Sequence, residues 1–135
     1  MKKILLIMMF VTALFSQEEW FTNYNKAISS AKETGKPIYI FEEMIGCPHC
    51  VEFKTTTLKD KEIIKSLKRD FVLLKFTYDK SNIPTYLESD YFPAHFVIDS
   101  NEEIITETTG FKTIEMFSVL MEDALMIADI LKEED

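Results

Sequence analysis

The chain has 135 residues, of which 47% are hydrophobic and 28% charged, and its formal net charge is −8. This length is enough for one domain with its own core and too short for two. The excess of acidic residues repels polyanions, so we expect neither nucleic acid nor an anionic lipid surface as a partner.

The first 16 residues have the pattern of an export signal. Lys2 and Lys3 give a positive start, and an apolar run follows over residues 4–15. As a helix this run would span roughly 18 Å, short of the ~30 Å hydrocarbon core of a membrane. We therefore expect a cleaved signal peptide over residues 1–16, a domain over residues 17–135, and a periplasmic or otherwise exported location. An uncleaved membrane anchor and a buried N-terminal helix remain alternatives.

The first half of the domain predicts a helix, a buried strand and two more helices. The first helix is indicated by five residues that share one helical face: Trp20, Tyr24, Ala27, Ile28 and Ala31. The apolar, β-prone run over residues 38–41 predicts a strand buried on both sides. Helices are expected from residue 48 to about 58 and over residues 61–69.

The second half predicts three strands and a long terminal helix. Strands are expected over residues 71–76, 94–99 and 103–108, with a short helix over residues 84–89. The last two strands form a hairpin whose two-residue turn is Ser100-Asn101. Thr113 caps the final helix, whose expected inner face consists of Ile114, Phe117, Met121, Ala124, Leu125, Ala128 and Leu131. The order predicts an α/β protein with a mixed central sheet of about four strands flanked by helices.

Both cysteines of the chain lie in the segment IGCPHCV, residues 45–51. A c-type haem anchor requires histidine directly after the second cysteine, where this chain has Val51. A structural zinc site needs about four ligands, and the only histidines are His49 and His95. A structural disulfide closing so small a ring would remove only about 2 kcal/mol of chain entropy from the unfolded state.

A redox centre uses every residue of this segment. Cys47 follows a buried strand and precedes a helix, whose N-terminal amides and partial positive charge favour a thiolate. Pro48 suits the first helical position. Cys50, about one turn later, can close a disulfide with Cys47, so we expect Cys47 to be the exposed nucleophile and Cys50 the shielded resolving thiol. A protonated His49 would further favour the thiolate and an oxidising pair, although a solvent-exposed histidine without such a role is the alternative.

Four segments together resemble the thioredoxin-fold superfamily, in particular its exported thioredoxin-related branch. They are Cys47-Pro48-His49-Cys50 after a strand, the element YFPAHFVID at residues 91–99, AKETGKPIYIF, and CPHCVEFKTTTLKDKEIIKSLKRDFVLLKF. The resemblance covers roughly residues 20–131. The Pro-His dipeptide is similar to that of the DsbA-type oxidases.

The resemblance implies roles for individual residues. Pro93 would be a cis-proline beside Cys47, and the backbone of Phe92 would pair with a substrate strand; with Gly46 these form the expected substrate-binding set. The expected catalytic set is Cys47, Pro48, His49 and Cys50. No cofactor and no metal are expected. The partners would be protein thiols or disulfides, as substrates, and a redox donor or acceptor protein. We expect the protein itself to be a monomer.

One position departs from the family pattern. Many members carry a buried carboxylate six positions before the first cysteine, where this chain has Phe41. Glu42 and Glu43 follow it, and we interpret both as solvated charges at the strand end. We interpret His95, two residues past Pro93, as a half-buried structural histidine.

The sequence thus predicts an exported thiol–disulfide oxidoreductase, with the direction of exchange left open. A copper- or zinc-handling module using the same thiols and a catalytically idle thioredoxin-like interaction domain remain alternatives.

Overall fold

The computed structural model describes residues 20–78 and 83–134, so the predicted signal segment lies outside the described residues. The elements follow in this order: α1 (Tyr24–Thr34), β1 (Ile38–Glu43), α2 (Pro48–Thr55), η1 (Thr57–Lys59), α3 (Lys61–Asp70), β2 (Val72–Thr77), η3 (Thr85–Leu87), β3 (Ala94–Ile98), β4 (Ile104–Thr109) and α4 (Ile114–Glu133).

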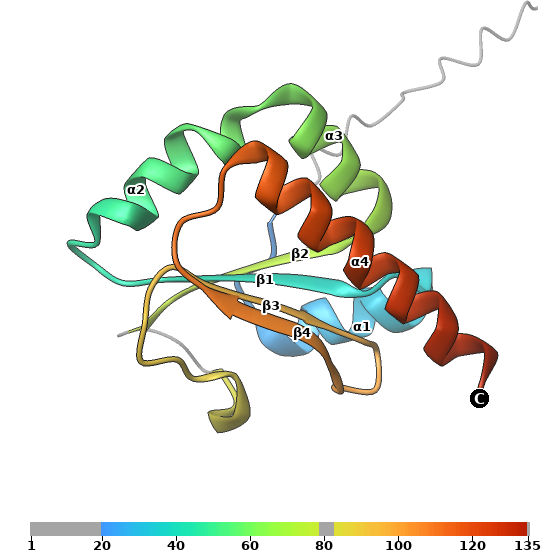
Figure 1. Ribbon diagram of the computed structural model, residues 1–135. Coiled ribbons are helices and arrows are strands. Elements are labelled where there is room, and N and C mark those ends of the chain that lie inside the picture. Colours follow the sequence, from blue (N-terminus) through green and yellow to red (C-terminus); the bar gives the residue numbers. More distant parts are fainter. Residues whose placement is uncertain (1–19, 79–82, 135) are drawn as a thin grey trace, which may run out of the picture.

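A four-stranded mixed sheet with the order β2-β1-β3-β4 forms the centre of the molecule. β1 pairs with β2 in parallel and with β3 antiparallel, and β3 and β4 form an antiparallel hairpin. α1 covers one face of the sheet, and α2, α3 and α4 cover the other (Figure 1). The predicted α/β class with a mixed, helix-flanked sheet is confirmed.

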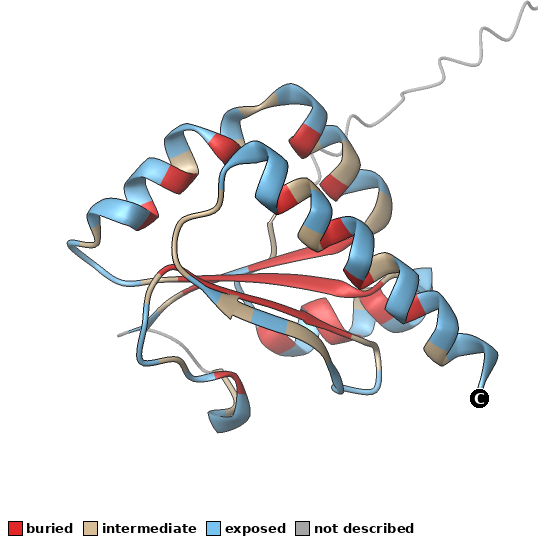
Figure 2. Cartoon of the chain, in the orientation of Figure 1, coloured by how far each residue is buried: buried red, intermediate tan, exposed pale blue. Residues whose placement is uncertain are grey.

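Each face of the sheet has its own apolar core, and the central strands are buried throughout (Figure 2). Ile38 and Ile40 of β1 pack with α1, whereas Tyr39 and Phe41 pack with the helices on the other face. This follows from the alternation of side chains along a strand. The expectation of a strand buried on both sides is confirmed.

Side-chain caps fix where the helices begin. Asn23 accepts from the amide of Lys26 at the start of α1, and Asp60 accepts from the amides of Glu62 and Ile63 at the start of α3. Thr113 accepts from the amide of Met116, which confirms the predicted cap of α4. Such bonds satisfy amides that have no partner inside the helix.

The first predicted helix was wrong at its N-terminal end. Because Asn23 caps α1, Trp20 lies outside the helix and packs on the opposite face of the sheet, edge-on to Tyr39 with ring centroids 6.0 Å apart. Phe21 explains the displacement, since its amide and carbonyl bond to Leu73 and Lys75 along the edge of β2.

The predicted helix over residues 48–58 is interrupted after Thr55. The hydroxyl of Thr55 bonds to the carbonyl of Val51, that of Thr56 bonds to the carbonyl of Glu52, and α2 ends there. Thr57 then starts the one-turn η1, and its buried hydroxyl bonds to the carbonyl of Lys112. Hydroxyls that compete for helix carbonyls are a common reason for such a break.

Two smaller predictions were also wrong. The hairpin turn contains three residues rather than two, since the amide of Asp99 bonds to the carbonyl of Glu103 and Glu102 adopts a left-handed φ of 68°. On α4, Ile114 is 44% exposed, while Phe117, Met121, Ala124 and Ala128 are buried as expected.

None of the helices in residues 20–78 and 83–134 is both long and apolar enough to cross a membrane.

Candidate active site

The two cysteines lie at one end of the sheet. β1 ends at Glu43 and α2 begins at Pro48, so Cys47 occupies the connection between them. Because β1 and β3 are antiparallel and Glu42 pairs with Ala94, the start of β3 lies beside the end of β1. The structure therefore brings Cys47 and the segment before β3 to the same end of the sheet (Figure 1).

Cys47 is the N-cap residue of α2. A disulfide joins it to Cys50, with the two Cα atoms 5.3 Å apart. The Sγ of Cys47 also accepts a hydrogen bond from the amide of Cys50 at 3.2 Å. A sulfur that accepts from a helix N-terminal amide is in the position where negative charge is most favoured.

The two sulfurs differ in their access to solvent. Cys50 is 1% exposed and belongs to the core beneath α2 together with Phe53. Cys47 is partly exposed and lies against the edge of the same core. This difference matches the predicted arrangement of an accessible first cysteine and a shielded second one.

The residues around the cysteines have distinct backbone and side-chain settings. Gly46 has a φ of 76°, and a Cβ added there would meet no atom within 4 Å, so glycine is favoured by backbone conformation rather than by space. Pro48 occupies the first turn of α2, where its missing amide proton has no cost. The His49 side chain is 71% exposed, and its Nδ1 lies 3.7 Å from a carboxylate oxygen of Glu52.

The peptide bond between Phe92 and Pro93 is cis, as the resemblance implied. Pro93 is buried, and its carbonyl accepts from the amide of Gly110 at 2.8 Å. Phe92 is half-buried against the core that contains Cys50. In the described part of the chain, the amide and the carbonyl of Phe92 have no backbone partner.

The structure contradicts the interpretation of Glu42 as a solvated charge. β1 extends two residues beyond the predicted strand, which places Glu42 on the α1 face between Phe76 and Ala94, and it is fully buried. Among the residues that the structure describes, neither carboxylate oxygen has a hydrogen-bond partner. Burial, with a smaller contribution from the nearby charge of Glu88, raises the pKa of Glu42 from 4.5 to about 7.

Alternation along β1 could have indicated this burial, because Glu42 continues the inward series of Ile38 and Ile40. Glu43, the next residue, forms an ion pair of 2.6 Å with Lys54 of α2.

His95 is buried completely rather than by half. Its exposed fraction is 1%, its Nδ1 lies 2.8 Å from the hydroxyl of Tyr39, and its Nε2 lies 2.9 Å from the carbonyl of Gly110. The carbonyl can only accept, so Nε2 donates and Nδ1 accepts from the tyrosine. Burial lowers the pKa of His95 to about 4, so the ring is a neutral structural group.

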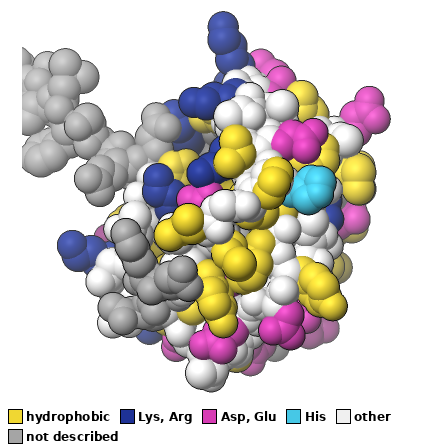
Figure 3. Space-filling view, turned by 90° about the vertical axis from the view of Figure 1, so that its left-hand side faces the viewer, with side chains coloured by type: hydrophobic (Ala, Val, Ile, Leu, Met, Phe, Trp, Pro, Cys, Tyr) yellow, Lys and Arg dark blue, Asp and Glu magenta, His cyan; other side chains and the backbone are white. Residues whose placement is uncertain are grey.

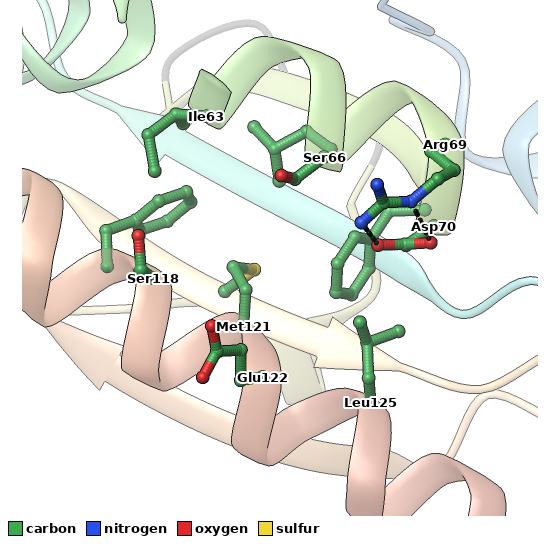
Figure 4. A pocket seen from close by; sticks show the side chains of 11 residues that line it. Ile63, Ser66, Arg69, Asp70, Ser118, Met121, Glu122 and Leu125 are labelled. Carbon is green, nitrogen blue, oxygen red and sulfur yellow. Dashed lines mark hydrogen bonds and ion pairs between the residues drawn. The ribbon is translucent and has the colours of Figure 1, made fainter.

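Other hollows and donor groups lie elsewhere. Over the part of the chain that is described, no three His, Cys, Asp or Glu side chains gather closely enough to hold a metal ion. A cavity of about 140 Å³ lies between α3 and α4, with the bidentate Arg69–Asp70 ion pair on its rim (Figure 4). Its lining residues include neither cysteine nor the segment before β3.

A cysteine pair that forms a disulfide at a helix N-terminus, at the same end of a mixed sheet as a cis-proline, defines a thioredoxin-like protein. The family model described as thioredoxin-like matches residues 19–100, and the chain belongs to this family.

Similar proteins include both curated relatives and solved structures. Anterior gradient protein 2 homolog of Homo sapiens is 25% identical over 114 residues, and the match covers 84% of this chain and 65% of that protein. The chain thus spans less than two thirds of that relative's length.

Two solved structures show the same fold. The DsbH oxidoreductase has a TM-score of 0.62 at 18% identity and covers 79% of this chain and 83% of its own. The oxidised C-terminal domain of DsbD from Neisseria meningitidis has a TM-score of 0.61 at 22% identity and covers 78% of this chain and 98% of its own.

Proposed function

We propose that this protein is an exported thiol–disulfide oxidoreductase that exchanges disulfides with protein substrates through Cys47 and Cys50. The observation that carries the proposal is the position of Cys47, a partly exposed sulfur that caps α2 and accepts from an amide of that helix. This position stabilises a thiolate, which is the species that attacks a disulfide and also the better leaving group.

In the reducing direction, the Cys47 thiolate attacks one sulfur of a substrate disulfide. An S–S bond forms between Cys47 and the substrate, and the substrate's other sulfur leaves as a thiolate that takes up a proton. Deprotonated Cys50 then attacks the Cys47 sulfur, which releases the second substrate thiolate and closes the Cys47–Cys50 disulfide. Two electrons have passed from the protein to the substrate.

In the oxidising direction, a substrate thiolate attacks the Sγ of Cys47 and Cys50 leaves. A second substrate thiolate attacks the substrate sulfur of this mixed disulfide, so the substrate disulfide forms and Cys47 leaves as a thiolate. A separate redox protein resets the pair in either case. The electrons reside on the sulfurs, and neither step requires a cofactor.

The other predicted site residues support this exchange. Within residues 20–78 and 83–134 the amide and carbonyl of Phe92 have no backbone partner, so they are suited to pairing with an extended substrate segment. Pro93 fixes the backbone at that point, and Gly46 keeps the other side of the site free of a side chain. His49 lies in the first turn of α2 between the two cysteines of the chain, and its side chain is exposed.

Export and substrate type rest on different support. The positive start and apolar run of residues 1–16 support export, and an oxidising compartment is where such exchange is useful. Protein substrates are supported by the partly exposed position of Cys47 at the same end of the sheet as Phe92, whose backbone groups have no backbone partner among the described residues.

The direct test compares Cys47→Ser, Cys50→Ser and the wild type in insulin disulfide reduction and in trapping a substrate. Wild type should turn over insulin, and both variants should not. Cys50→Ser should accumulate a mixed disulfide that Cys47→Ser cannot form, because only the first sulfur is accessible. A wild type that neither turns over insulin nor reacts with small thiols would contradict the proposal. Titrating reduced and oxidised protein with Cu(I) and Zn(II) would reveal a metal-handling module instead.

A further inference from the structure

The outer side of α4 carries large apolar side chains that face solvent. The inner side of this helix packs into the core through Phe117, Met121, Ala124 and Ala128. Figure 2 shows the outward side of α4 exposed over most of its length. A helix that packs on one side only is expected to be polar on the other. Four large apolar side chains on the outer side are nevertheless more than half exposed: Met116 53%, Val119 57%, Met126 58% and Ile130 52%.

These four residues follow the spacing of a coiled-coil seam. Together with Asp123 they occupy positions 116, 119, 123, 126 and 130, which alternate between steps of three and four residues. Residues at such steps form one row along a helix and face a single partner helix. We call this row the α4 seam, and it consists of Met116, Val119, Asp123, Met126 and Ile130.

Exposed carboxylates accompany the α4 seam. Glu115, Glu122 and Asp129 each lie one position before a seam residue and so follow the seam along one side, while Asp123 lies within it. None of these four carboxylates forms an ion pair or a hydrogen bond with another residue of 20–78 or 83–134. The α4 seam therefore lies in a negative field, which favours a cationic partner.

A second copy of α4 does not suit the seam. In a symmetric pair of α4 helices, Asp123 would face either its own counterpart or an apolar seam residue of the other copy. A carboxylate that loses its water without gaining a cation or a hydrogen bond is strongly destabilising. The acidic residues also repel an anionic lipid surface. The occupant that the seam favours is therefore a different helix, with a cation opposite Asp123.

The α4 seam is separate from the end of the molecule that carries the cysteine pair. That end, where β1 connects to α2, faces the viewer in Figure 3. In Figure 1 it lies on the left, whereas α4 ends on the right of the molecule. A partner bound along the seam therefore leaves the exchange site open.

We propose that the α4 seam binds a helix of a partner protein, whose apolar residues pack against the four apolar seam residues and whose lysine or arginine pairs with Asp123. Further cations of that helix face the three carboxylates beside the seam, since residues that flank a coiled-coil seam set the choice of partner. A single polar residue within such a seam fixes the register of the two helices. The α4 seam is thus a docking surface that takes no part in the disulfide exchange itself.

Two synthetic helical peptides are the probes. Both have leucine at all seam positions but the central one and lysine at the flanking positions, and the central residue is lysine in the first peptide and glutamate in the second. A scrambled version of the first peptide reports attraction by charge alone. Fluorescence anisotropy gives the dissociation constants, with the labelled peptide kept below the concentration at which it self-associates.

The protein is tested as wild type, as Asp123→Lys and as the double variant Val119→Ser/Met126→Ser. All replaced side chains are exposed, so each variant should fold like wild type. Ile114→Ser is the matched control, because Ile114 is 44% exposed on the same helix but lies outside the seam.

Wild type should bind the central-lysine peptide at least about tenfold more tightly than the central-glutamate peptide, which corresponds to about 1.4 kcal/mol. Asp123→Lys should reverse this preference, a result that a merely structural role of Asp123 would not produce. The double variant should bind the central-lysine peptide at least about tenfold more weakly than wild type, because apolar contact area is lost. Ile114→Ser should leave the dissociation constants unchanged, and every variant should reduce insulin like wild type.

Three results would overturn the inference. The first is that the three peptides bind wild type equally well or not at all. The second is a wild type that sediments as a dimer and a double variant that sediments as a monomer, which would make the seam an interface between copies. The third is binding to vesicles of phosphatidylcholine and phosphatidylglycerol that the double variant loses. Failure of wild type to reduce insulin would contradict the proposed function and leave the α4 seam unaffected.

Discussion

At the scale of single residues, Glu42 is the least expected feature of the structure. It is a fully buried carboxylate that has no hydrogen-bond partner in the described part of the chain, and it lies five positions before Cys47. A buried carboxylate without partners disfavours its own charged form, so the raised pKa of about 7 makes the folded protein bind a proton that the unfolded chain releases near pH 4.5. The residue therefore lowers stability as the pH rises through that interval.

Glu42→Gln should remove this dependence. The shift from 4.5 to about 7 corresponds to about 3 kcal/mol, so at pH 8 the variant should unfold with a free energy up to about 3 kcal/mol higher than wild type. Near pH 4.5 the gain should nearly vanish. Urea unfolding at both values measures the difference. Glu43→Gln is the control, and it should give no gain at either pH because Glu43 is paired with Lys54. An effect of Glu42→Gln that is the same at both pH values would show that the pKa of Glu42 is not raised in the folded protein.

His95 has the opposite influence on stability. Its pKa is lowered to about 4 by burial, so the folded protein resists a proton that the unfolded chain takes up near pH 6.5. The contribution of His95 to the free energy of unfolding is fully present above pH 6.5. It is lost as the pH falls toward 4, by about 3 kcal/mol in total. Nuclear magnetic resonance of the imidazole should show His95 still neutral at pH 5.5. A midpoint near 6.5 would mean that the ring is not buried as the structure has it.

At the scale of elements, α2 links the chemistry to the fold through one sulfur. Cys47 both closes the disulfide and caps the helix. A serine oxygen can accept the capping hydrogen bond but cannot form a disulfide, whereas alanine can do neither.

At a pH below the Cys47 pKa, where the thiolate makes no contribution, reduced Cys47→Ser should keep the stability of the reduced wild type to within about 0.5 kcal/mol, and reduced Cys47→Ala should lose about 1 kcal/mol. Both should be inactive in exchange. Denaturant unfolding in the presence of a reductant separates the two roles, and equal stability of the two variants would show that the sulfur does not act as a cap.

Features set by neighbours in the sequence could be predicted, and those set by distant contacts could not. The strand over residues 38–41, the cap by Thr113 and the start of α2 after Cys47 follow from local composition. Glu102 adopts a left-handed conformation in a turn where its carboxylate accepts from the hydroxyl of Tyr24 on α1, a partner 78 positions away. Nothing near Glu102 in the sequence indicates that contact.

The same distinction holds for the site. The Cys47–Cys50 pair was visible as a motif, and the cis bond before Pro93 came from the resemblance. Ile45 in the β1–α2 connection and Tyr91 before the cis-proline are 65% and 73% exposed. This exposure could not be predicted, because large apolar residue types are common in a core and the turns that keep these two outside it are not evident from the sequence.

At the scale of the whole molecule, the relative stability of the oxidised and reduced forms reports the direction of exchange. Closing a four-residue ring stabilises the oxidised form by only about 2 kcal/mol in the chain-entropy model. A thiolate held at the start of α2 stabilises the reduced form, and a stabilised reduced form makes the disulfide oxidising.

Because ring closure favours the oxidised form by about 2 kcal/mol, a reduced form that is the more stable one at neutral pH requires a Cys47 pKa below about 5.5, and such a pair would be oxidising. The stability of the reduced form relative to the oxidised form should grow as the pH rises from the folded thiol pKa toward the ordinary cysteine value of about 8.5, because a lowered pKa contributes fully only above the unfolded value. Unfolding curves of both forms between pH 5 and 8 measure this. An oxidised form that is more stable throughout would indicate a reductant.

The measurement closest to the centre of this account is the titration of the Cys47 thiolate, followed by its ultraviolet absorbance in the Cys50→Ser variant. Held by the amides that open α2, the sulfur should ionise at least about one pH unit below the ordinary cysteine value of about 8.5. A midpoint at or above that value would show that the helix does not activate Cys47, and the proposed exchange chemistry would lose its physical basis.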